Sequence, residues 1–359
     1  MIIGVDAGAL SIKDDRLRVG VWRVTYNLLK ELSHIDKTNE YRLYTFRPIS
    51  REVMRAFGSR MINVVVRPMI GWSKIQLPIE LRRHPVDAFL GLSQMLPYYS
   101  PAHAIGFVYD LGFLHYPSAY PGSLKKLEYQ TKQLIRRSGK IIAISEFTKK
   151  DIVKTYATNS SRIAVAYPGA DERFNLRGPR HTNKNPYILF VGAIKRGKNV
   201  PLALRIFKNF LASVKEPYDF IIVGGNYWED PEINDTIAEL GLRDRVQFTG
   251  FIPDKAVPSY YRGASALLVS SRWEGFCLPA VEAMACGCPI VSVHHGSLPE
   301  IVGEGGAIFT DEHEAALALR KVTTNALFRK KLIRAGLKRS KQFTWKRFAR
   351  SIYGIISSR

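Results

Sequence analysis

Two glutamates, Glu274 and Glu282, stand eight positions apart where the sequence changes from a strand-like to a helix-like pattern. The apolar run 266–270 precedes them, Gly275 interrupts the strand pattern, and Pro279 is compatible with the first turn of a helix. Helix formers follow, and a glycine and a proline end the pattern. We therefore expect Glu274 on a strand-to-helix loop and Glu282 about one turn inside the helix.

The two carboxylates flank a potential anion site. Backbone amides at the start of a helix point toward an anion, and each ionised carboxylate accepts hydrogen bonds from hydroxyl groups. The arrangement suits a ligand with hydroxyl groups on both sides of a phosphate, and a nucleotide sugar is such a ligand. A surface glutamate and an unrelated helix glutamate could share this spacing, so the pair alone leaves both interpretations open.

Strand-like and helical patterns alternate along the whole chain, which predicts an α/β fold with mostly parallel strands. In the first half we expect strands at 2–6, 41–46, 62–67, 88–92, 104–109, 140–144 and 163–167, with helices at 20–32, 51–57, 123–137 and 148–156. In the second half we expect strands at 187–191, 220–223, 246–249, 266–270, 289–293 and 306–309, helices at 202–214, 231–240 and 256–261, and a helical C-terminal region.

A chain of 359 residues predicts about two domains. We expect one Rossmann-like domain over 1–171, a polar linker over 172–186 and a second Rossmann-like domain over 187–342, because glycine and prolines interrupt the region between them. Ligands of such sheets bind beyond the carboxyl ends of the strands, so two such domains would face a cleft.

The net charge of +22 is unevenly distributed. Residues 1–180 carry 28 basic and 15 acidic residues, 181–312 carry 12 and 15, and 313–359 carry 13 and 1. The basic regions, including the amphipathic segment 123–137, indicate an anionic partner such as a phospholipid surface or a pyrophosphate-linked acceptor. Nucleic acid is the competing interpretation, and no zinc-finger, basic-zipper or RNA-recognition signature supports it.

Targeting and metal signals are weak in this chain. No signal-like or membrane-spanning run is present, so we expect a soluble, cytoplasmic protein that could act at the inner face of a membrane. The clustered cysteines do not indicate disulfides, and together with two nearby histidines they fit no common zinc pattern: Cys277, Cys286, Cys288, His294 and His295. We expect no metal and no separate cofactor, since no Asp-x-Asp pair exists to hold a nucleotide-bound Mg²⁺.

The segment 272–291 resembles the signature of glycosyltransferase family 4, which consists of retaining enzymes of the GT-B fold. Other blocks that are similar to the family's lie at 108–111, 143–146, 167–171, 187–199, 246–252, 298–302 and 343–345. The resemblance implies an N-terminal acceptor domain, a C-terminal nucleotide-sugar domain, and a last helix over 343–359 that crosses back to the N-terminal domain.

Carried over by position, the resemblance assigns the donor site. It implies that Glu282 binds the ribose hydroxyls, that Glu274 contacts the donor sugar and that Lys198 neutralises the leaving diphosphate. Arg196 is placed one residue earlier than the family's usual arginine, so a solvated loop is its alternative. The remaining donor-binding positions are glycines and backbone amides: Gly192, Gly250, Gly275, Phe276, Cys277 and Leu278.

Two positions in the first half are implied at the reacting centre. Gly20 matches the family's acceptor or phosphate loop, with helix packing as the alternative. Asp110 follows Tyr109, which replaces a histidine common in the family, and is a candidate for orienting the sugar or acceptor, with helix capping as the alternative.

These observations predict a retaining hexosyltransferase that moves mannose, as the first choice of sugar, from a nucleotide diphosphate sugar to a hydroxyl of a glycan or lipid-linked saccharide. The leaving phosphate oxygen would take the acceptor proton in a front-face attack. Two alternatives remain open: a sugar-nucleotide epimerase of the same fold, and a non-enzymatic basic protein that binds nucleic acid or membrane.

Overall fold

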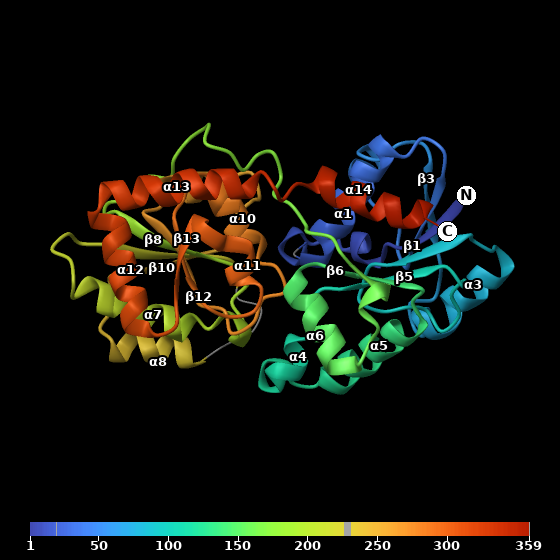
Figure 1. Cartoon of the computed structure of the whole chain (residues 1–359), viewed down its shortest axis with the longest axis horizontal. Helices are drawn as coiled ribbons and strands as arrows, with labels where there is room; N and C mark the ends of the chain where they lie inside the picture. The colour runs from blue at the N-terminus through green and yellow to red at the C-terminus, as the bar shows by residue number, and fades with distance from the viewer. Residues whose placement is uncertain (19, 226–230, 359) are drawn as a thin grey trace. The chain divides into compact units, whose positions relative to one another are not determined.

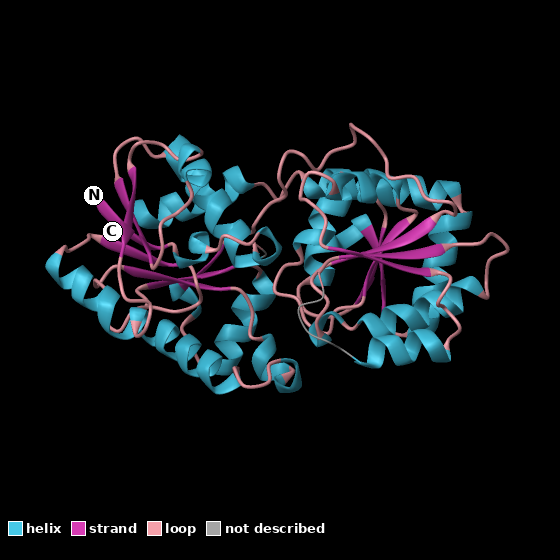
Figure 2. Ribbon diagram, turned by 180° about the vertical axis from the view of Figure 1, so that it is seen from behind, coloured by secondary structure: helices cyan, strands magenta, loops and turns pink. Residues whose placement is uncertain are grey.

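The computed structural model describes residues 1–18, 20–225 and 231–358. The chain forms two compact units. Unit 1 comprises Met1–Pro168 together with Trp345–Arg359, and unit 2 comprises Gly169–Thr344. Both are α/β units whose helices cover the two faces of a parallel sheet (Figures 1 and 2), which is the fold class that the alternating sequence pattern predicts.

The sheet of unit 1 is entirely parallel. Its strand order is β3 (Met61–Val65), β2 (Glu40–Thr45), β1 (Ile2–Asp6), β4 (Ala88–Gly91), β5 (Ala104–Val108), β6 (Lys140–Ala143) and β7 (Ile163–Val165). The helices of this unit are α1 (Gly20–Ile35), α2 (Arg51–Arg55), α3 (Leu77–Arg83), α4 (Gly112–His115), α5 (Leu124–Arg137), α6 (Glu146–Tyr156) and α14 (Trp345–Ser357).

The central strands of unit 1 are apolar because both of their faces are covered by helices. All residues of β4 and β5 are buried, as expected for a parallel sheet between two helical layers. The last helix, α14, packs in this unit against α1. Phe348 of α14 meets Phe107 of β5 edge to face, with ring centroids 6.4 Å apart.

The sheet of unit 2 is also parallel. Its strand order is β10 (Val246–Gly250), β9 (Asp219–Val223), β8 (Tyr187–Val191), β11 (Ala266–Val269), β12 (Ile290–Val293) and β13 (Gly306–Phe309). Its helices are α7 (Val200–Leu211), α8 (Pro231–Glu239), α9 (Val257–Gly263), α10 (Leu278–Ala285), α11 (Leu298–Val302), α12 (Glu312–Thr324) and α13 (Ala326–Ser340). In Figure 1, α10 and α13 cover one face of the sheet, and α7 and α12 cover the other.

Both sheets have one switch point, where neighbouring strands continue to opposite edges of the sheet. In unit 1 this point lies between β1 and β4, and in unit 2 it lies between β8 and β11. Loops leaving the carboxyl ends of such a strand pair diverge and create a crevice, which is where open α/β sheets bind ligands. The strand order therefore gives each unit one candidate ligand-binding crevice.

The segment 172–186, which the sequence suggested as a linker, packs onto unit 2. Phe174 is buried against Tyr261, with ring centroids 5.9 Å apart, and the side chain of Asn183 donates to Asp219 at 2.7 Å. The boundary between the units accordingly falls earlier, at Pro168 and Gly169. Most of the segment is exposed, but Asn183 and Asn185 donate to Asp219 and tie it to unit 2.

The sequence pattern located the strands to within a few residues, but it assigned no helix to α4, to α11 or to the stretch between β3 and β4. In that stretch a turn of π-helix, Trp72–Gln76, leads into α3. Gly71 in the left-handed region and Pro78 at the helix start obscure the helical pattern there. Across the described ranges, no helix is both long enough and apolar enough to cross a membrane.

Candidate active site

Three glycines line the carboxyl ends of the first strands of unit 2. Gly192 follows β8, Gly224 follows β9 and Gly250 ends β10, and each of the three has a positive φ. The Gly192 amide donates to the Val223 carbonyl at 3.0 Å, and the Gly224 amide donates to the Gly250 carbonyl at 3.1 Å. A Cβ on Gly224 would collide with the Gly192 carbonyl, so this edge of the sheet is a surface of bare backbone.

The loop after β8 is fastened to the loop after β11, across the switch point. A single 3₁₀ turn, Arg196–Lys198, ends at Asn199 in the left-handed region. The Ser270 hydroxyl contacts the carbonyl oxygens of Lys198 and Asn199, each at 3.0 Å, and the Arg272 amide donates to the Gly197 carbonyl at 2.9 Å. The two loops thus fix each other's backbone before any ligand arrives.

An ion pair joins the two loops. Lys198 Nζ contacts Glu274 Oε1, and the Ser271 hydroxyl donates to the same carboxylate oxygen at 2.6 Å. The side chains are only 17% and 12% exposed. Burial tends to raise the pKa of Glu274, but the charge of Lys198, the hydrogen bonds from Lys198 and Ser271 and the charge of Lys195 outweigh it, so the pKa is lowered.

The backbone of Glu274 is held in place by the loop after β12. The Ser297 amide donates to the Glu274 carbonyl at 3.0 Å. Gly296 has a φ of 62°, and a Cβ at this position would lie 2.6 Å from the same carbonyl oxygen. A glycine is therefore required for the close approach that sets the position of Glu274.

Glu282 lies on α10, where the sequence places it, but its side chain points into the protein. The residue is 3% exposed, and its Oε2 accepts a hydrogen bond of 2.9 Å from the hydroxyl of Tyr261, which lies on α9. Tyr261 is fully buried. A tyrosine hydroxyl from a neighbouring helix thus orients the carboxylate that the sequence assigns to the nucleotide.

The start of α10 has an unusual backbone. Cys277 precedes the helix with φ 74° and ψ 74°, a conformation that non-glycine residues rarely adopt and that often marks functional loops. Phe276 is buried and packs edge to face on Phe343, with centroids 5.5 Å apart. These contacts fix the direction of the amides of Gly275 to Leu278 at the helix start.

The cysteine cluster is part of the core. Cys277, Cys286 and Cys288 are free and buried, and burial raises the pKa of the Cys286 and Cys288 thiols to about 12. His294 and His295 are exposed. The described part of the chain contains no group of three or more His, Cys, Asp or Glu residues positioned to hold a metal ion.

Of the predicted donor residues, the structure brings Lys198, Glu274 and the glycine edge together, and it leaves Arg196 exposed on the turn. Lys195, rather than Arg196, contributes its charge to the Glu274 carboxylate. Sequence reasoning also missed Ser271 and Tyr261. Ser271 lies three residues before Glu274, but nothing in the sequence shows which serine of that loop faces the carboxylate.

Residues 171–339 match the family model described as glycosyl transferases group 1. O-antigen chain mannosyltransferase B of Escherichia coli is 24% identical over 255 residues, which cover 67% of either chain. Three curated relatives are matched over 67%, 53% and 58% of their own lengths, so the chain spans between about half and two thirds of these relatives. The part of the chain that carries Glu274 and Glu282 therefore resembles the group 1 glycosyltransferases.

Solved structures show the fold of this chain. Sucrose-phosphate synthase from Thermosynechococcus elongatus superposes with a TM-score of 0.80 at 17% identity, covering 99% of this chain and 98% of that one. Anabaena HepE, solved in complex with UDP and glucose, superposes with a TM-score of 0.75 at 16% identity, covering 100% and 99%. The chain has the GT-B fold, with two parallel-sheet α/β domains.

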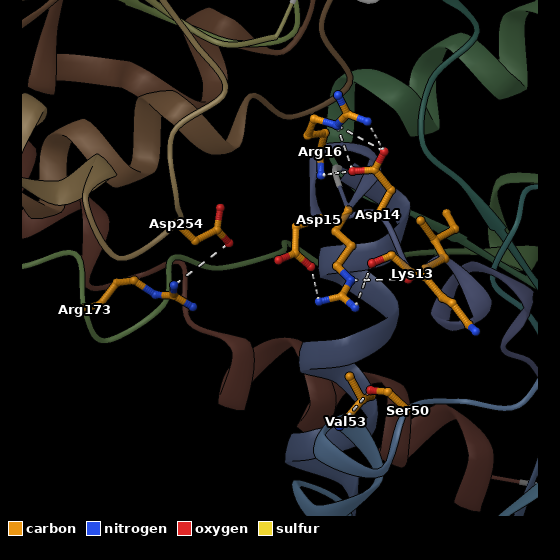
Figure 3. A network of polar contacts seen from close by, with 10 residues as sticks. Lys13, Asp14, Asp15, Arg16, Ser50, Val53, Arg173 and Asp254 are labelled. Atoms are coloured by element: carbon orange, nitrogen blue, oxygen red, sulfur yellow. Dashed lines mark hydrogen bonds and ion pairs between the residues drawn. The ribbon is translucent and has the colours of Figure 1, made fainter.

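In unit 1, charged side chains of the loop between β1 and α1 pair with one another. Asp14 caps a short 3₁₀ turn and holds the Arg16 guanidinium, with the shortest contact at 2.8 Å (Figure 3). The Arg18 guanidinium lies 5.2 Å from the centre of the Trp22 ring. Gly20 begins α1 with φ 30°, and a Cβ there would have open space around it, so packing does not require glycine at this position.

Asp110 follows β5 and caps the next turn. Its Oδ1 accepts a 2.8 Å hydrogen bond from the Gly112 amide, and its carbonyl accepts one of 3.1 Å from Gln94. Gln94 has φ 55° and also accepts a 2.9 Å bond from the Tyr109 amide. One carboxylate oxygen of Asp110 therefore caps the turn, and the role of Asp110 in orienting the sugar stays a prediction.

The structure adds Asp6, which the sequence showed only as a break in an apolar run. It ends β1 at the switch point of unit 1 and is 2% exposed. Oδ1 accepts a 3.2 Å bond from the Gly8 amide, while Oδ2 is buried and has no hydrogen-bond partner among residues 1–18, 20–225 and 231–358. Burial raises the pKa of Asp6, and polar contacts with Ser93 and Gly8 offset part of that rise.

Proposed function

We propose that this chain is a retaining hexosyltransferase of glycosyltransferase family 4. It would transfer mannose, as the first choice, from a nucleotide diphosphate sugar to a hydroxyl of a glycan or lipid-linked saccharide. The observation that carries the proposal is the largely buried ion pair between Lys198 and Glu274 at the switch point of unit 2. The buried Glu282 lies on α10, the helix that follows the Glu274 loop.

The chemistry needs charge at defined places. Departure of a nucleoside diphosphate develops negative charge on its outer phosphate, and a cation already fixed there lowers the barrier. Lys198 supplies that cation, and the Gly192 edge lets a phosphate approach the backbone next to it, since Gly192 lies beside the lysine stem. Glu274 supplies an acceptor for hydroxyl groups of the transferred sugar.

We further propose front-face attack, in which the leaving phosphate oxygen takes the proton of the acceptor hydroxyl as the new glycosidic bond forms and the old one breaks. This route assigns no nucleophile to a side chain and retains the configuration of the sugar. The transfer would need no metal ion. Activity that survives a chelator, with product of retained anomeric configuration by NMR, supports this route, and an inverted product contradicts it.

The name of one relative supports the choice of sugar and acceptor. The name of the Escherichia coli relative describes mannose transfer to an O-antigen chain, and this supports a mannosyl donor and a polysaccharide acceptor. Thermal unfolding of the protein with UDP-, GDP-, ADP- and dTDP-sugars tests the donor directly. One nucleotide sugar should raise Tm, and epimer formation without transfer would favour the epimerase alternative.

Replacing Glu282 with alanine should weaken donor binding. We expect KM for the nucleotide sugar to rise about 10- to 100-fold with little change in kcat, because lost ribose contacts act equally before and during the reaction. Tyr261→Phe is the matched control, since it removes only the hydroxyl that orients Glu282, and KM should rise a few-fold. A Glu282→Ala enzyme with unchanged KM would contradict the ribose role.

Asp6 offers a test of the acceptor side. Because burial raises its folded pKa, the carboxyl destabilises the fold increasingly as pH rises through that pKa. Asp6→Asn should therefore raise the free energy of unfolding at pH 7 by about 1–3 kcal/mol, with a smaller gain near pH 4. If Oδ2 binds an acceptor hydroxyl, kcat/KM for the acceptor should fall about tenfold or more, and a stabilised enzyme with full activity would reject this role.

A further inference from the structure

A set of exposed apolar and tyrosine side chains covers one part of unit 1. Its members are between 36% and 85% exposed, and Ile70 is the most exposed among them. Isolated exposed apolar residues are common on soluble proteins, whereas a contiguous group marks a binding surface. We call this group the isoleucine–tyrosine patch; it consists of Met69, Ile70, Ile75, Ile79, Tyr98, Tyr99 and Tyr129.

Hydrogen bonds join the separate segments that carry these residues. The Tyr98 amide donates to the Ser73 carbonyl at 3.0 Å, which ties the strip around Tyr98 to the π-helical turn that carries Ile75. The hydroxyls of Tyr98 and Tyr129 lie 3.1 Å apart, so α5 borders the patch. Ile79 follows Ile75 by four residues in continuous helix, which places both on one side.

Cations surround the apolar side chains. Arg82 lies 4.7 Å from the centre of the Tyr99 ring, Lys74 lies 6.0 Å from that of Tyr98, and Arg137 donates to the Tyr98 carbonyl at 2.7 Å. Residues 67–83 contain four basic residues and one acid, for a net charge of +3. That acid, Glu80, is paired with His84 at 2.9 Å.

We propose that the isoleucine–tyrosine patch is a docking surface for an anionic phospholipid bilayer. The isoleucines would enter the acyl boundary, the tyrosines would lie at the level of the headgroups, and Lys74, Arg82 and Arg137 would neutralise lipid phosphates. The inference is independent of the sugar-transfer chemistry, because every residue in it lies in unit 1 and none belongs to the donor site.

Charge favours a bilayer over a second copy of the chain. The protein carries +22, and two copies meeting through this patch would bring their cations together. An anionic bilayer would attract these cations instead, and its acyl region could take up a side chain as exposed as Ile70. A dimer or an acidic protein partner would require the same side chains to be covered by protein, and both are outcomes of the test below.

Helix α13 is the competing surface. A groove of about 360 Å³ on this helix is lined by apolar stems and basic heads: Lys330, Ile333, Arg334, Leu337, Lys338 and Lys341. Its apolar residues lie within the groove, whereas Leu327 protrudes alone at 81% exposure. Leu327 therefore serves both as a control matched to Ile70 in exposure and as a probe for membrane binding through α13.

The experiment is co-sedimentation of the full chain with vesicles of phosphatidylcholine, with or without phosphatidylglycerol. The wild type should bind only the anionic vesicles, and salt should weaken the binding. Ile70→Asp/Ile75→Asp should lower the partition coefficient by about tenfold per isoleucine, and Lys74→Gln/Arg82→Gln by about fivefold per charge. Leu327→Asp and Lys208→Gln, an exposed lysine on α7, should bind as the wild type does.

Thermal unfolding and nucleotide-sugar binding establish that each variant is folded, and Ile70→Ser provides a milder change should the double aspartate variant fail to fold. A wild type that does not bind anionic vesicles overturns the proposal. Full binding by the Ile70 variants, or loss of binding by Leu327→Asp alone, also overturns it. If the Ile70 variants change the oligomeric state by light scattering and leave vesicle binding intact, the patch is a protein interface instead.

Discussion

Replacing Lys198 with methionine should lower kcat of sugar transfer by about 10²- to 10³-fold, because one preorganised charge at a developing oxyanion has an effect of that size. Methionine keeps most of the aliphatic stem that lies beside Gly192 and removes the charge. The loss should appear in kcat and in kcat/KM together, since the diphosphate acquires its extra charge only as it leaves. Steady-state kinetics with saturating donor measure it.

Loss of structure must be separated from loss of chemistry. Lys198→Met leaves the Glu274 carboxylate, which is 12% exposed, without its cation, and breaking a buried pair costs about 3–5 kcal/mol. The double variant Lys198→Met/Glu274→Gln should recover much of this stability and stay inactive. Lys184→Met, at an exposed lysine of unit 2, should behave as the wild type. A stable Lys198→Met enzyme with kcat within threefold of wild type, about 0.7 kcal/mol, would remove Lys198 from the reaction.

Replacing Glu274 with glutamine should lower kcat by about 10²-fold and alter donor affinity much less. Glutamine keeps the shape and one acceptor, but it loses the charge that strengthens hydrogen bonds to the sugar hydroxyls near the reacting carbon. Glu274→Asp keeps the charge and retracts it, so intermediate activity is expected. Equal kcat for the glutamine variant and the wild type would show that the carboxylate serves only to hold Lys198.

The same substitution predicts a change in pH dependence. The folded pKa of Glu274 is lowered from its ordinary 4.5, so its pairing stabilises the protein fully above that pH and is lost as pH falls through the folded pKa. The difference in unfolding free energy between wild type and Glu274→Gln should be constant at neutral pH and shrink in acid. A difference that grew as pH fell would contradict the direction of the shift.

The sequence predicted the loop of Glu274 and the helix of Glu282 because strand and helix signals there are local and strong. It could not predict that Lys198 touches Glu274, since the two are 76 positions apart and meet only because β8 lies beside β11. The sequence could not predict the role of Tyr261 for the same reason, because its partner, Glu282, lies on another helix.

Other features depended on long-range packing. In the sequence, Asp6 is a single polar residue at the end of a strand. Only the strand order shows that it lies at the switch point of unit 1. The basic character of α5 suggested an anionic surface, but the exposed isoleucines, Ile70, Ile75 and Ile79, lie before, within and after the π-helical turn, where the sequence shows no helical periodicity. The sequence showed that this half of the chain is basic, and only the fold showed which exposed apolar residues lie near the basic side chains.

The donor-site assignment is tested most directly by calorimetric titration of the accepted nucleotide sugar into wild type, Glu282→Ala and Lys198→Met/Glu274→Gln. Binding to the wild type should be measurable. Kd should rise at least about tenfold in Glu282→Ala, which removes contacts that hold the bound donor, and it should change much less in the double variant, whose side chains act mainly as the diphosphate leaves. Equal Kd values in all three proteins, or no binding of any nucleotide sugar to the wild type, would show that unit 2 does not hold the donor in this way.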